Sequence, residues 1–440
     1  MPDLKKYRIV LPENPTYNER RAADFITSCV KIVAGYKIPT VKDTEAPYEY
    51  ELCVGRTNRE VIDGLSFDRC VERTYEGLLF GKGNRIYFVG LGINTEKTDK
   101  PFKSYEYIND GAYGALYAAY RFVEDTVGYN FLYAVNESYP ENTEIEVDPS
   151  VSVTLTREYV ENELPKKTDG DVMYVFPSVE LQRNADIIVI KTQKGGLSVV
   201  GGGLAVDAEH VVSVLESLSD GKKPFVESWF VSRLHPYSTG ALAKILEDSR
   251  VEIGKIYAEL MPREFYTDKA TDKNAECGAI YDILTASGKL CNVKTGDIIS
   301  LDSVDVRVMF APIYDENEKM SVGSSGVVYR VETENKKVLL MGESGEKGGR
   351  AILEGEINPK SDAVILTNYG GVGIPEAFFK AVAANECVFS VGIRDLYGEY
   401  GEGLYTRNTG IIRSRDLLMS SGVPSRKQYR TTFGVQTLPL

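Results

Sequence analysis

Residues 225–242, FVESWFVSRLHPYSTGAL, decide the fold of the larger part of this chain. Most of the first eight residues are aromatic or β-branched, which are the types enriched in strands, and they predict a β-strand at 225–232. Residues 241–249, ALAKILEDS, predict a helix, so that RLHPYSTG between them forms a polar loop. We therefore expect a group of polar side chains at the end of this strand, namely Arg233, His235, Tyr237 and Ser238.

Other strand-like runs occur in groups on both sides of this stretch. The group before it is followed by a helix at about 207–219, for which Asp207 is the candidate N-cap. A helix is also predicted within residues 373–386, before the strand CVFSVG. The remaining predicted strands are 171–176, 185–191, 197–200, 304–311, 326–332, 337–341 and 362–367. Groups of strands with a helix after each group predict two packed sheets covered by helices.

The amino-terminal part has a different pattern, in which strands and helices alternate. An amphipathic helix runs from Ala22 to Val33 before Gly35, and a second helix is predicted between Asp110 and Gly128. This alternation predicts a small α/β module, with strands at 7–11, 50–54, 77–80 and 85–89.

A polar, proline-bearing segment at 136–170 predicts a domain boundary. We therefore expect one domain at 1–150 and a second at 165–440.

The overall charge argues against two classes of partner. The 440 residues contain 64 Asp and Glu against 51 Lys and Arg, and the net charge is −13. This sign is unsuited to nucleic acid or to an anionic membrane surface. The start of the chain lacks the apolar run of a signal peptide, and no stretch of 18 uncharged apolar residues exists, so we expect a cytoplasmic protein.

The histidines and cysteines limit the possible metal chemistry. Only His210 and His235 are present, which excludes a zinc mechanism built on several imidazoles. We expect His210 to be exposed on its helix. The six cysteines form no C-x-x-C pair and lie in apolar contexts, so we interpret them as buried thiols in a reducing compartment.

The glycine clusters do not form a nucleotide site. Gly201-Gly202-Gly203 is not followed by the G-K-[ST] of a P-loop, and Gly90-Leu91-Gly92 lacks a third glycine and a following helix. We expect the first cluster to be a tight turn after a strand.

The amino-terminal residues carry a first family resemblance. Three features carry it: CVGRTNR at 53–59 after a strand, Gly90 after RIYFV, and GAYGALY at 111–117 at the start of a helix. Together they resemble the non-catalytic α/β domain that precedes the barrel in bacterial alpha-glucuronidases and hexosaminidases. The resemblance implies a scaffold domain and a link to carbohydrate metabolism, and it implies no activity because no barrel follows.

From about residue 171 onward, the order of elements resembles the metallo-β-lactamase superfamily, particularly its competence-protein-type branch. In that superfamily a strand leads into T-H-x-H-x-D-H-x-G-G-L, and the corresponding stretch here is Ser232–Leu242. Of the four metal ligands in that motif only His235 is retained. The other three positions are occupied by Arg233, Tyr237 and Ser238.

The later ligand positions of the superfamily have changed as well. The aspartate position of L-x-G-D corresponds to Glu343, and the middle histidine falls near Ser324-Ser325. The H-H-G motif corresponds to Asn368-Tyr369-Gly370. A protein site for zinc needs at least three converging ligands, and a hydroxyl or amide does not replace an imidazole. The resemblance therefore implies α/β and α+β architecture, a small accessory domain followed by an αββα sandwich, without a zinc cofactor.

Arg233 at a former ligand position suggests how the vacated site is filled. A guanidinium supplies some of the volume and charge of the lost metal, and Glu343 is its natural acidic partner. We predict an ion pair between Arg233 and Glu343. The alternative is that Arg233 extends into solvent.

Two functions follow from these residues. The first is a non-catalytic protein of carbohydrate metabolism that binds a carbohydrate or small anionic ligand in the former active cleft. The alternative is a hydrolase that works with a single or atypical metal site through Glu343 and His235. Ser238 as a nucleophile would require His235 as its base, and chance proximity is the simpler interpretation. The candidate cleft residues are Arg233, His235, Tyr237, Ser238, Glu343, Asn368 and Tyr369.

Overall fold

The chain divides into two compact units in a computed structural model. Unit 1 is Met1–Tyr159, and unit 2 begins at Val160 and includes the carboxyl terminus. The structure describes residues 1–68, 70, 76–91, 113–133, 139, 143–156, 160–161, 164–166, 168–272, 274–367, 371, 373–397 and 406–440, the last range without side chains at 406–410.

Unit 1 contains one mixed sheet of six strands. Its strand order is β2-β1-β3-β5-β4-β6, in which β2, β1, β3 and β5 are parallel and β4 is antiparallel to both of its neighbours. The strands are β1 (Arg8–Leu11), β2 (Thr40–Lys42), β3 (Glu51–Val54), β4 (Gly77–Lys82), β5 (Arg85–Val89) and β6 (Ser152–Leu155). The four strands predicted for this part of the chain are confirmed, and β2 and β6 are additional.

The helices of unit 1 begin and end at recognisable signals. Helix α1 (Tyr17–Ala34) has a capping box between Thr16 and Glu19 and ends at Gly35, whose φ is 78°. Helix α3 (Gly114–Phe122) continues in a π-helical turn (Val123–Val127) to Gly128. This confirms the described part of the second predicted helix, while Asp110 lies outside the described residues. A short helix, α2 (Arg59–Ile62), follows β3.

A buried carboxylate at the start of β3 ties together strands β1 and β5 and helix α2 of unit 1. The side chain of Glu51 is fully buried and accepts hydrogen bonds from Arg59 at 2.9 Å, Arg85 at 2.8 Å and Arg8 at 2.7 Å. Burial alone would raise the pKa of Glu51, but the three guanidinium groups outweigh it and lower the pKa to about 2. Arg59 is itself 1% exposed. The cluster therefore has a fully buried centre, Glu51 with Arg59, and two partly exposed arginines, Arg8 and Arg85, beside it.

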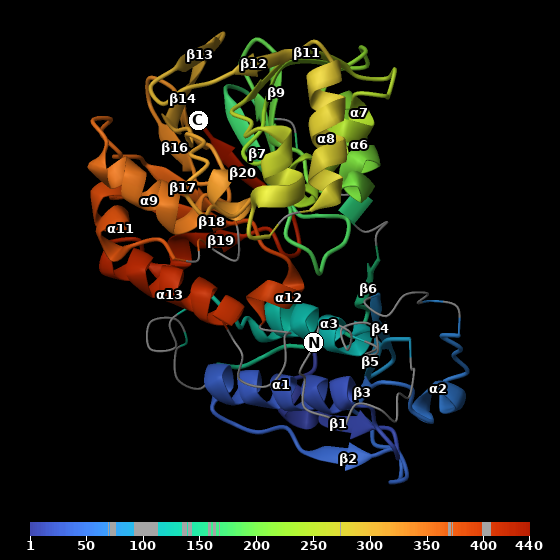
Figure 1. The fold of residues 1–440 in the computed structure, drawn as a ribbon. Helices are drawn as coiled ribbons and strands as arrows, with labels where there is room; N and C mark the ends of the chain where they lie inside the picture. The colour runs from blue at the N-terminus through green and yellow to red at the C-terminus, as the bar shows by residue number, and fades with distance from the viewer. Residues whose placement is uncertain are drawn as a thin grey trace. The chain divides into compact units, whose positions relative to one another are not determined.

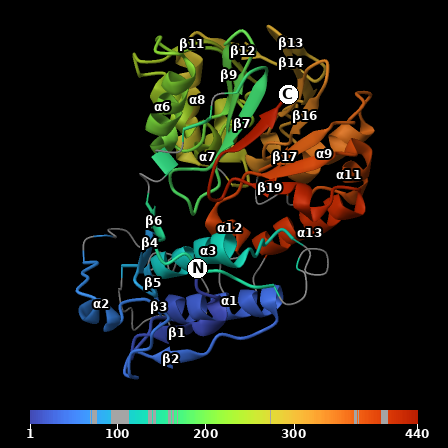
Figure 2. The ribbon, with the colours of Figure 1, turned by 180° about the vertical axis from the view of Figure 1, so that it is seen from behind.

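Unit 2 is an αββα sandwich. Its first sheet has the order β12-β11-β10-β9-β8-β7-β20 and its second has the order β13-β14-β15-β16-β17-β18-β19. Figure 1 shows α6, α7 and α8 beside the first sheet and α9 and α11 beside the second, and the view from behind in Figure 2 agrees. The predicted architecture of two packed sheets covered by helices is confirmed.

The elements of unit 2 have the following bounds. The first sheet contains β7 (Val172–Phe176), β8 (Ile187–Lys191), β9 (Leu197–Gly201), β10 (Phe225–Phe230), β11 (Glu252–Ala258), β12 (Leu290–Asn292) and β20 (Gln436–Pro439). The second contains β13 (Ile298–Leu301), β14 (Val304–Phe310), β15 (Val328–Glu332), β16 (Lys337–Leu340), β17 (Ala363–Leu366), β18 (Glu386–Phe389) and β19 (Gln428–Arg430). The α-helices are α6 (Ala208–Leu218), α7 (Pro236–Ile245), α8 (Ala275–Ala286), α9 (Gly345–Glu354), α11 (Glu376–Val382), α12 (Ile393–Leu396) and α13 (Thr406–Ser420).

Alternation along the strands supplies two apolar cores in unit 2. Phe230 belongs to the core between the sheets, where its ring lies 5.3 Å from that of Tyr257 and 5.4 Å from that of Tyr329. The preceding residue, Trp229, faces the helices and donates a hydrogen bond from its indole nitrogen to the carbonyl of Gly201 at 2.6 Å. Neighbouring residues of β10 therefore serve opposite faces of the sheet, as strand geometry requires.

The structure corrects the predicted start of one helix. Helix α7 begins at Pro236 rather than at Ala241, because proline is well suited to the first helical position and His235 acts as the N-cap. Much of the predicted loop RLHPYSTG therefore belongs to the helix. Asp207 does precede α6 as predicted, but its carboxylate accepts from the backbone nitrogens of Val179 and Leu204, each at 2.8 Å, instead of capping the helix.

The prediction that His210 is exposed is wrong, and the prediction that the six cysteines are buried is wrong for two of them. His210 is 1% exposed, because α6 packs against helix α7 as well as the first sheet. The His210 ring contacts that of Phe176 edge-on, with 5.7 Å between the ring centres. Burial lowers the pKa of His210 to about 4, so the imidazole is neutral at pH 7. Cys70 is exposed and Cys291 is partly exposed, whereas the other four cysteines are buried as predicted.

The length and hydropathy of the described helices decide whether any of them could cross a bilayer. None of them has both the length and the hydropathy that a membrane span needs.

Candidate functional site

An ion pair joins the two sheets of unit 2 where β10 and β16 end. Arg233 follows β10 of the first sheet, Glu343 follows β16 of the second, and the guanidinium Nη2 contacts the carboxylate Oε2. The two side chains are only 7% and 8% exposed. The predicted ion pair is present, and the alternative in which Arg233 extends into solvent is wrong.

The backbone brings these two strand ends together. The carbonyl of Ser232 accepts a hydrogen bond from the Val327 nitrogen at 2.7 Å, which ties the end of β10 to the start of β15. Gly342 has a φ of 51°, and a Cβ at this position would lie 3.2 Å from the Cβ of Ser232. A glycine before Glu343 thus permits both the left-handed turn and the close approach of the two chains.

A second buried carboxylate lies beside Arg233. Asp186, which precedes β8, accepts a hydrogen bond from the Ser232 hydroxyl and is 3% exposed. Burial raises the pKa of Asp186 to about 6, although the Ser232 hydrogen bond and the charge of Arg233 oppose this rise. Sequence reasoning missed Asp186. The signal that could have found it is a carboxylate that opens an otherwise apolar strand, ADIIVIK.

His235 has a structural task at the start of α7. Its Nδ1 accepts a hydrogen bond from the backbone nitrogen of Tyr237 at 3.2 Å. Burial, with a further contribution from the charge of Arg233, lowers the pKa of His235 to about 3. The imidazole is therefore neutral at pH 7, and the nitrogen that would serve as a base or ligand already caps the helix.

Tyr237 and Ser238 differ in their access to solvent. Tyr237 is half-buried, and its hydroxyl accepts a hydrogen bond from Arg183 Nη1 at 3.2 Å. Ser238 is fully buried within α7, so its hydroxyl does not line an open cleft, and that hydroxyl makes no hydrogen bond to the His235 side chain. This geometry gives no support to Ser238 as a nucleophile activated by His235.

The remaining candidate positions are partly described. Ser324 and Ser325 lie in a short 3-10 turn (Gly323–Ser325), and a Cβ at Gly323 would lie 3.5 Å from Arg233 Nη1. The turn that contains Ser324 and Ser325 therefore approaches Arg233 at Gly323. Asn368 and Tyr369 lie outside the described residues.

The donor set at this place does not fit a dinuclear metal centre. Glu343 is paired with Arg233, Asp186 with Ser232, and His235 with the backbone of α7. A divalent cation beside Glu343 would also meet the positive charge of the guanidinium. Across the described part of the chain, no three or more His, Cys, Asp and Glu side chains are grouped so that they could hold a metal ion.

Comparison of this chain with known proteins by sequence identifies no match. No family model matches it, and no curated protein matches it. Among solved structures, the diiron β-hydroxylase CmlA of Streptomyces venezuelae has a TM-score of 0.38 at 14% identity and covers 63% of this chain. This chain covers 55% of the hydroxylase, or about half of its length.

Two further solved structures have similar scores. The metallo-β-lactamase fold protein YhfI from Bacillus subtilis has a TM-score of 0.36 at 9% identity, with 61% of this chain and 100% of that chain covered. A B3 metallo-β-lactamase with an active-site glutamic acid has a TM-score of 0.34 at 12% identity, with 60% and 91% covered. The architecture of unit 2 is given by its own sheet order and layers, which form an αββα sandwich of two seven-stranded sheets.

Proposed function

We propose that unit 2 is a metal-free, non-catalytic binding protein built on a sandwich of metallo-β-lactamase type. The observation that carries this proposal is the buried ion pair of Arg233 and Glu343. A guanidinium at a former ligand position occupies the space of a metal and engages the carboxylate that would bind one. We also propose that the sandwich belongs to the competence-protein-type branch of that superfamily.

We further propose that the ligand is a carbohydrate or a small anion. Arg183 is a cation at this end of the sheets with 35% of its side chain exposed; its Nε lies 3.6 Å from a carboxylate oxygen of Glu180, and its Nη1 donates a hydrogen bond to the half-buried Tyr237. An arginine with an adjacent tyrosine suits a sugar carboxylate, because the guanidinium binds the acid and the ring packs on the sugar. A role for unit 1 as an accessory domain of alpha-glucuronidase type is consistent with this ligand class.

Elemental analysis tests the metal-free part of the proposal. Protein purified without chelator should contain less than about 0.1 equivalent of zinc, iron or manganese, because Glu343 and His235 are already engaged. One or two equivalents of metal that are lost in Glu343→Gln or His235→Gln would instead favour a hydrolase with an atypical metal site.

Calorimetric titration with D-glucuronate, and with D-glucose as its neutral counterpart, tests the ligand. Glucuronate should bind more tightly than glucose, and Arg183→Gln should weaken glucuronate binding by about tenfold through loss of a charge-assisted hydrogen bond. Arg250→Gln is the matched control, since Arg250 is an exposed arginine paired with Glu209 and Asp248 elsewhere on unit 2. Equal binding of both sugars, or no effect of Arg183→Gln, would count against this ligand class.

A further inference from the structure

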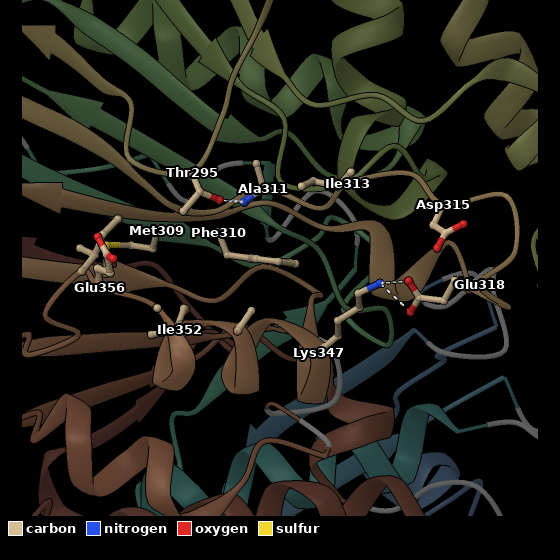
Figure 3. A pocket seen from close by; sticks show the side chains of 13 residues that line it. Thr295, Met309, Phe310, Ala311, Ile313, Asp315, Glu318, Lys347, Ile352 and Glu356 are labelled. Carbon is tan, nitrogen blue, oxygen red and sulfur yellow. Dashed lines mark hydrogen bonds and ion pairs between the residues drawn. The ribbon is translucent and has the colours of Figure 1, made fainter.

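A pocket on unit 2 is lined by residues other than Arg233 and Glu343. It has a volume of about 440 Å³ and is formed by β14, the segment 311–318 and helix α9 with the residues that follow it (Figure 3). This volume is within the range of small-molecule sites. The lining residues are Thr295, Met309, Phe310, Ala311, Ile313, Asp315, Glu318, Lys347, Ala351, Ile352, Gly355, Glu356 and Ile357.

The middle of the pocket is apolar. Figure 3 shows Met309 and Phe310 on one side and Ile352 of α9 on the other. The one polar side chain among the residues above them, Thr295, accepts a hydrogen bond from the Ala311 nitrogen at 2.9 Å. Ile313, at the opening, is 84% exposed. An apolar group that enters this space would cover these side chains without leaving a polar group unpaired.

The charged groups of the pocket are mostly acidic. Asp315, Glu318 and Glu356 supply three carboxylates against the single ammonium of Lys347. Lys347 is already neutralised, because its Nζ donates to both oxygens of Glu318, at 2.8 and 2.9 Å. Figure 3 places Asp315 near that pair at one end and Glu356 near Met309 at the other. The uncompensated charge around the apolar middle is therefore negative.

The apolar middle and the negative charge around it would complement an apolar molecule that carries a positive charge. We therefore infer that the pocket binds a small organic cation, a molecule with an apolar body and an ammonium group. The apolar body packs between Phe310 and Ile352, and the ammonium group lies beside Glu356. This site goes beyond the proposed function, because it is a different place with the opposite charge preference. It shares no residue with the Arg233 and Glu343 pair, so the two proposals can fail separately.

Three probes of one shape test the inference: 4-phenylbutylamine, 4-phenyl-1-butanol and 4-phenylbutyrate. Binding is followed by NMR of the full chain labelled with ¹³C at its methionine methyl groups, of which the sequence has seven. Met309 lines the pocket, and its signal is assigned with Met309→Leu. The amine should shift this signal with a Kd on the order of 1 mM, as expected for a fragment of this size, and bind about tenfold more tightly than the carboxylate.

Substitutions at the carboxyl end of α9 provide the control. Glu356→Gln should weaken the amine about threefold to fivefold and leave the alcohol unchanged. Glu354→Gln removes the same charge from an exposed residue that does not line the pocket, and it should change neither. The inference is wrong if the carboxylate binds as tightly as the amine, if both variants behave alike, or if no probe moves the Met309 signal. It is also wrong if that signal depends on protein concentration alone, which would indicate that a second copy covers the pocket.

Discussion

Replacing Arg233 with methionine should lower the free energy of unfolding of unit 2 by about 3–5 kcal/mol. The substitution leaves the Glu343 carboxylate, on a side chain that is 8% exposed, without its guanidinium partner. It also removes a positive charge that lowers the pKa of the buried Asp186. Two carboxylates would then remain in a largely buried environment, where an uncompensated charge is costly.

Urea unfolding followed by tryptophan fluorescence measures this effect within unit 2 alone. The chain has a single tryptophan, Trp229, and it is fully buried in the core beneath α6–α8. The double variant Arg233→Met/Glu343→Leu removes both charges and should recover most of the lost stability. If the single substitution costs less than about 1 kcal/mol, the pair is only a surface-type ion pair and our account of the site fails.

The sequence could predict the ion pair because the family resemblance places Arg233 and Glu343, each just after a predicted strand, at ligand positions of one former metal site. FVESWFVS leads into Arg233 and KVLLM leads into Gly342-Glu343, so the ends of two predicted strands set the positions of opposite charges. The environment of the pair could not be predicted in the same way. Asp186 lies just before β8, the first strand of the β8–β9 hairpin, whereas Ser232 follows β10. Nothing local to either residue indicates that they are in contact.

Elements that depend on distant partners or on glycine packing were also missed. Strand β20 (Gln436–Pro439) is short and contains a proline, and it forms because it pairs with β7 more than 250 residues earlier in the chain. Helix α9 contains Gly345, Gly348 and Gly349, which propensity alone would place in a loop. A Cβ at Gly349 would lie 3.1 Å from Pro375, so tertiary packing selects residues that local propensity disfavours. The pocket beside α9 could not be predicted from the sequence either, because it depends on the same tertiary packing of that helix.

In unit 1 we expect Glu51→Gln to destabilise the unit by about 3–5 kcal/mol. Glutamine keeps the shape of Glu51 but removes the negative charge that faces Arg8, Arg59 and Arg85. Arg85 retains its contact with Asp63 at 2.6 Å, whereas Arg59, at 1% exposure, would keep only neutral acceptors. A buried guanidinium without a carboxylate is the costly product of this substitution.

The pH dependence of unfolding separates the charge of Glu51 from its packing. The pKa of Glu51 is lowered from 4.5 to about 2 in the native state, so the unfolded chain binds a proton that the folded chain does not in this range. The stability from this carboxylate is therefore fully present above pH 4.5 and is lost as pH falls toward 2. The difference between the parent protein and Glu51→Gln should shrink over that window by roughly 3 kcal/mol.

Circular dichroism of the full chain reports unfolding of unit 1 as a transition that Trp229 fluorescence does not share. Glu49→Gln removes the same charge from an exposed neighbour of Glu51 and should leave that transition in place. A packing role alone would give Glu51→Gln a small cost that is the same at pH 7 and pH 3. A large cost at pH 7 that declines on acidification is the result that requires a buried carboxylate balanced by three arginines, because only the charged form of Glu51 distinguishes the two side chains.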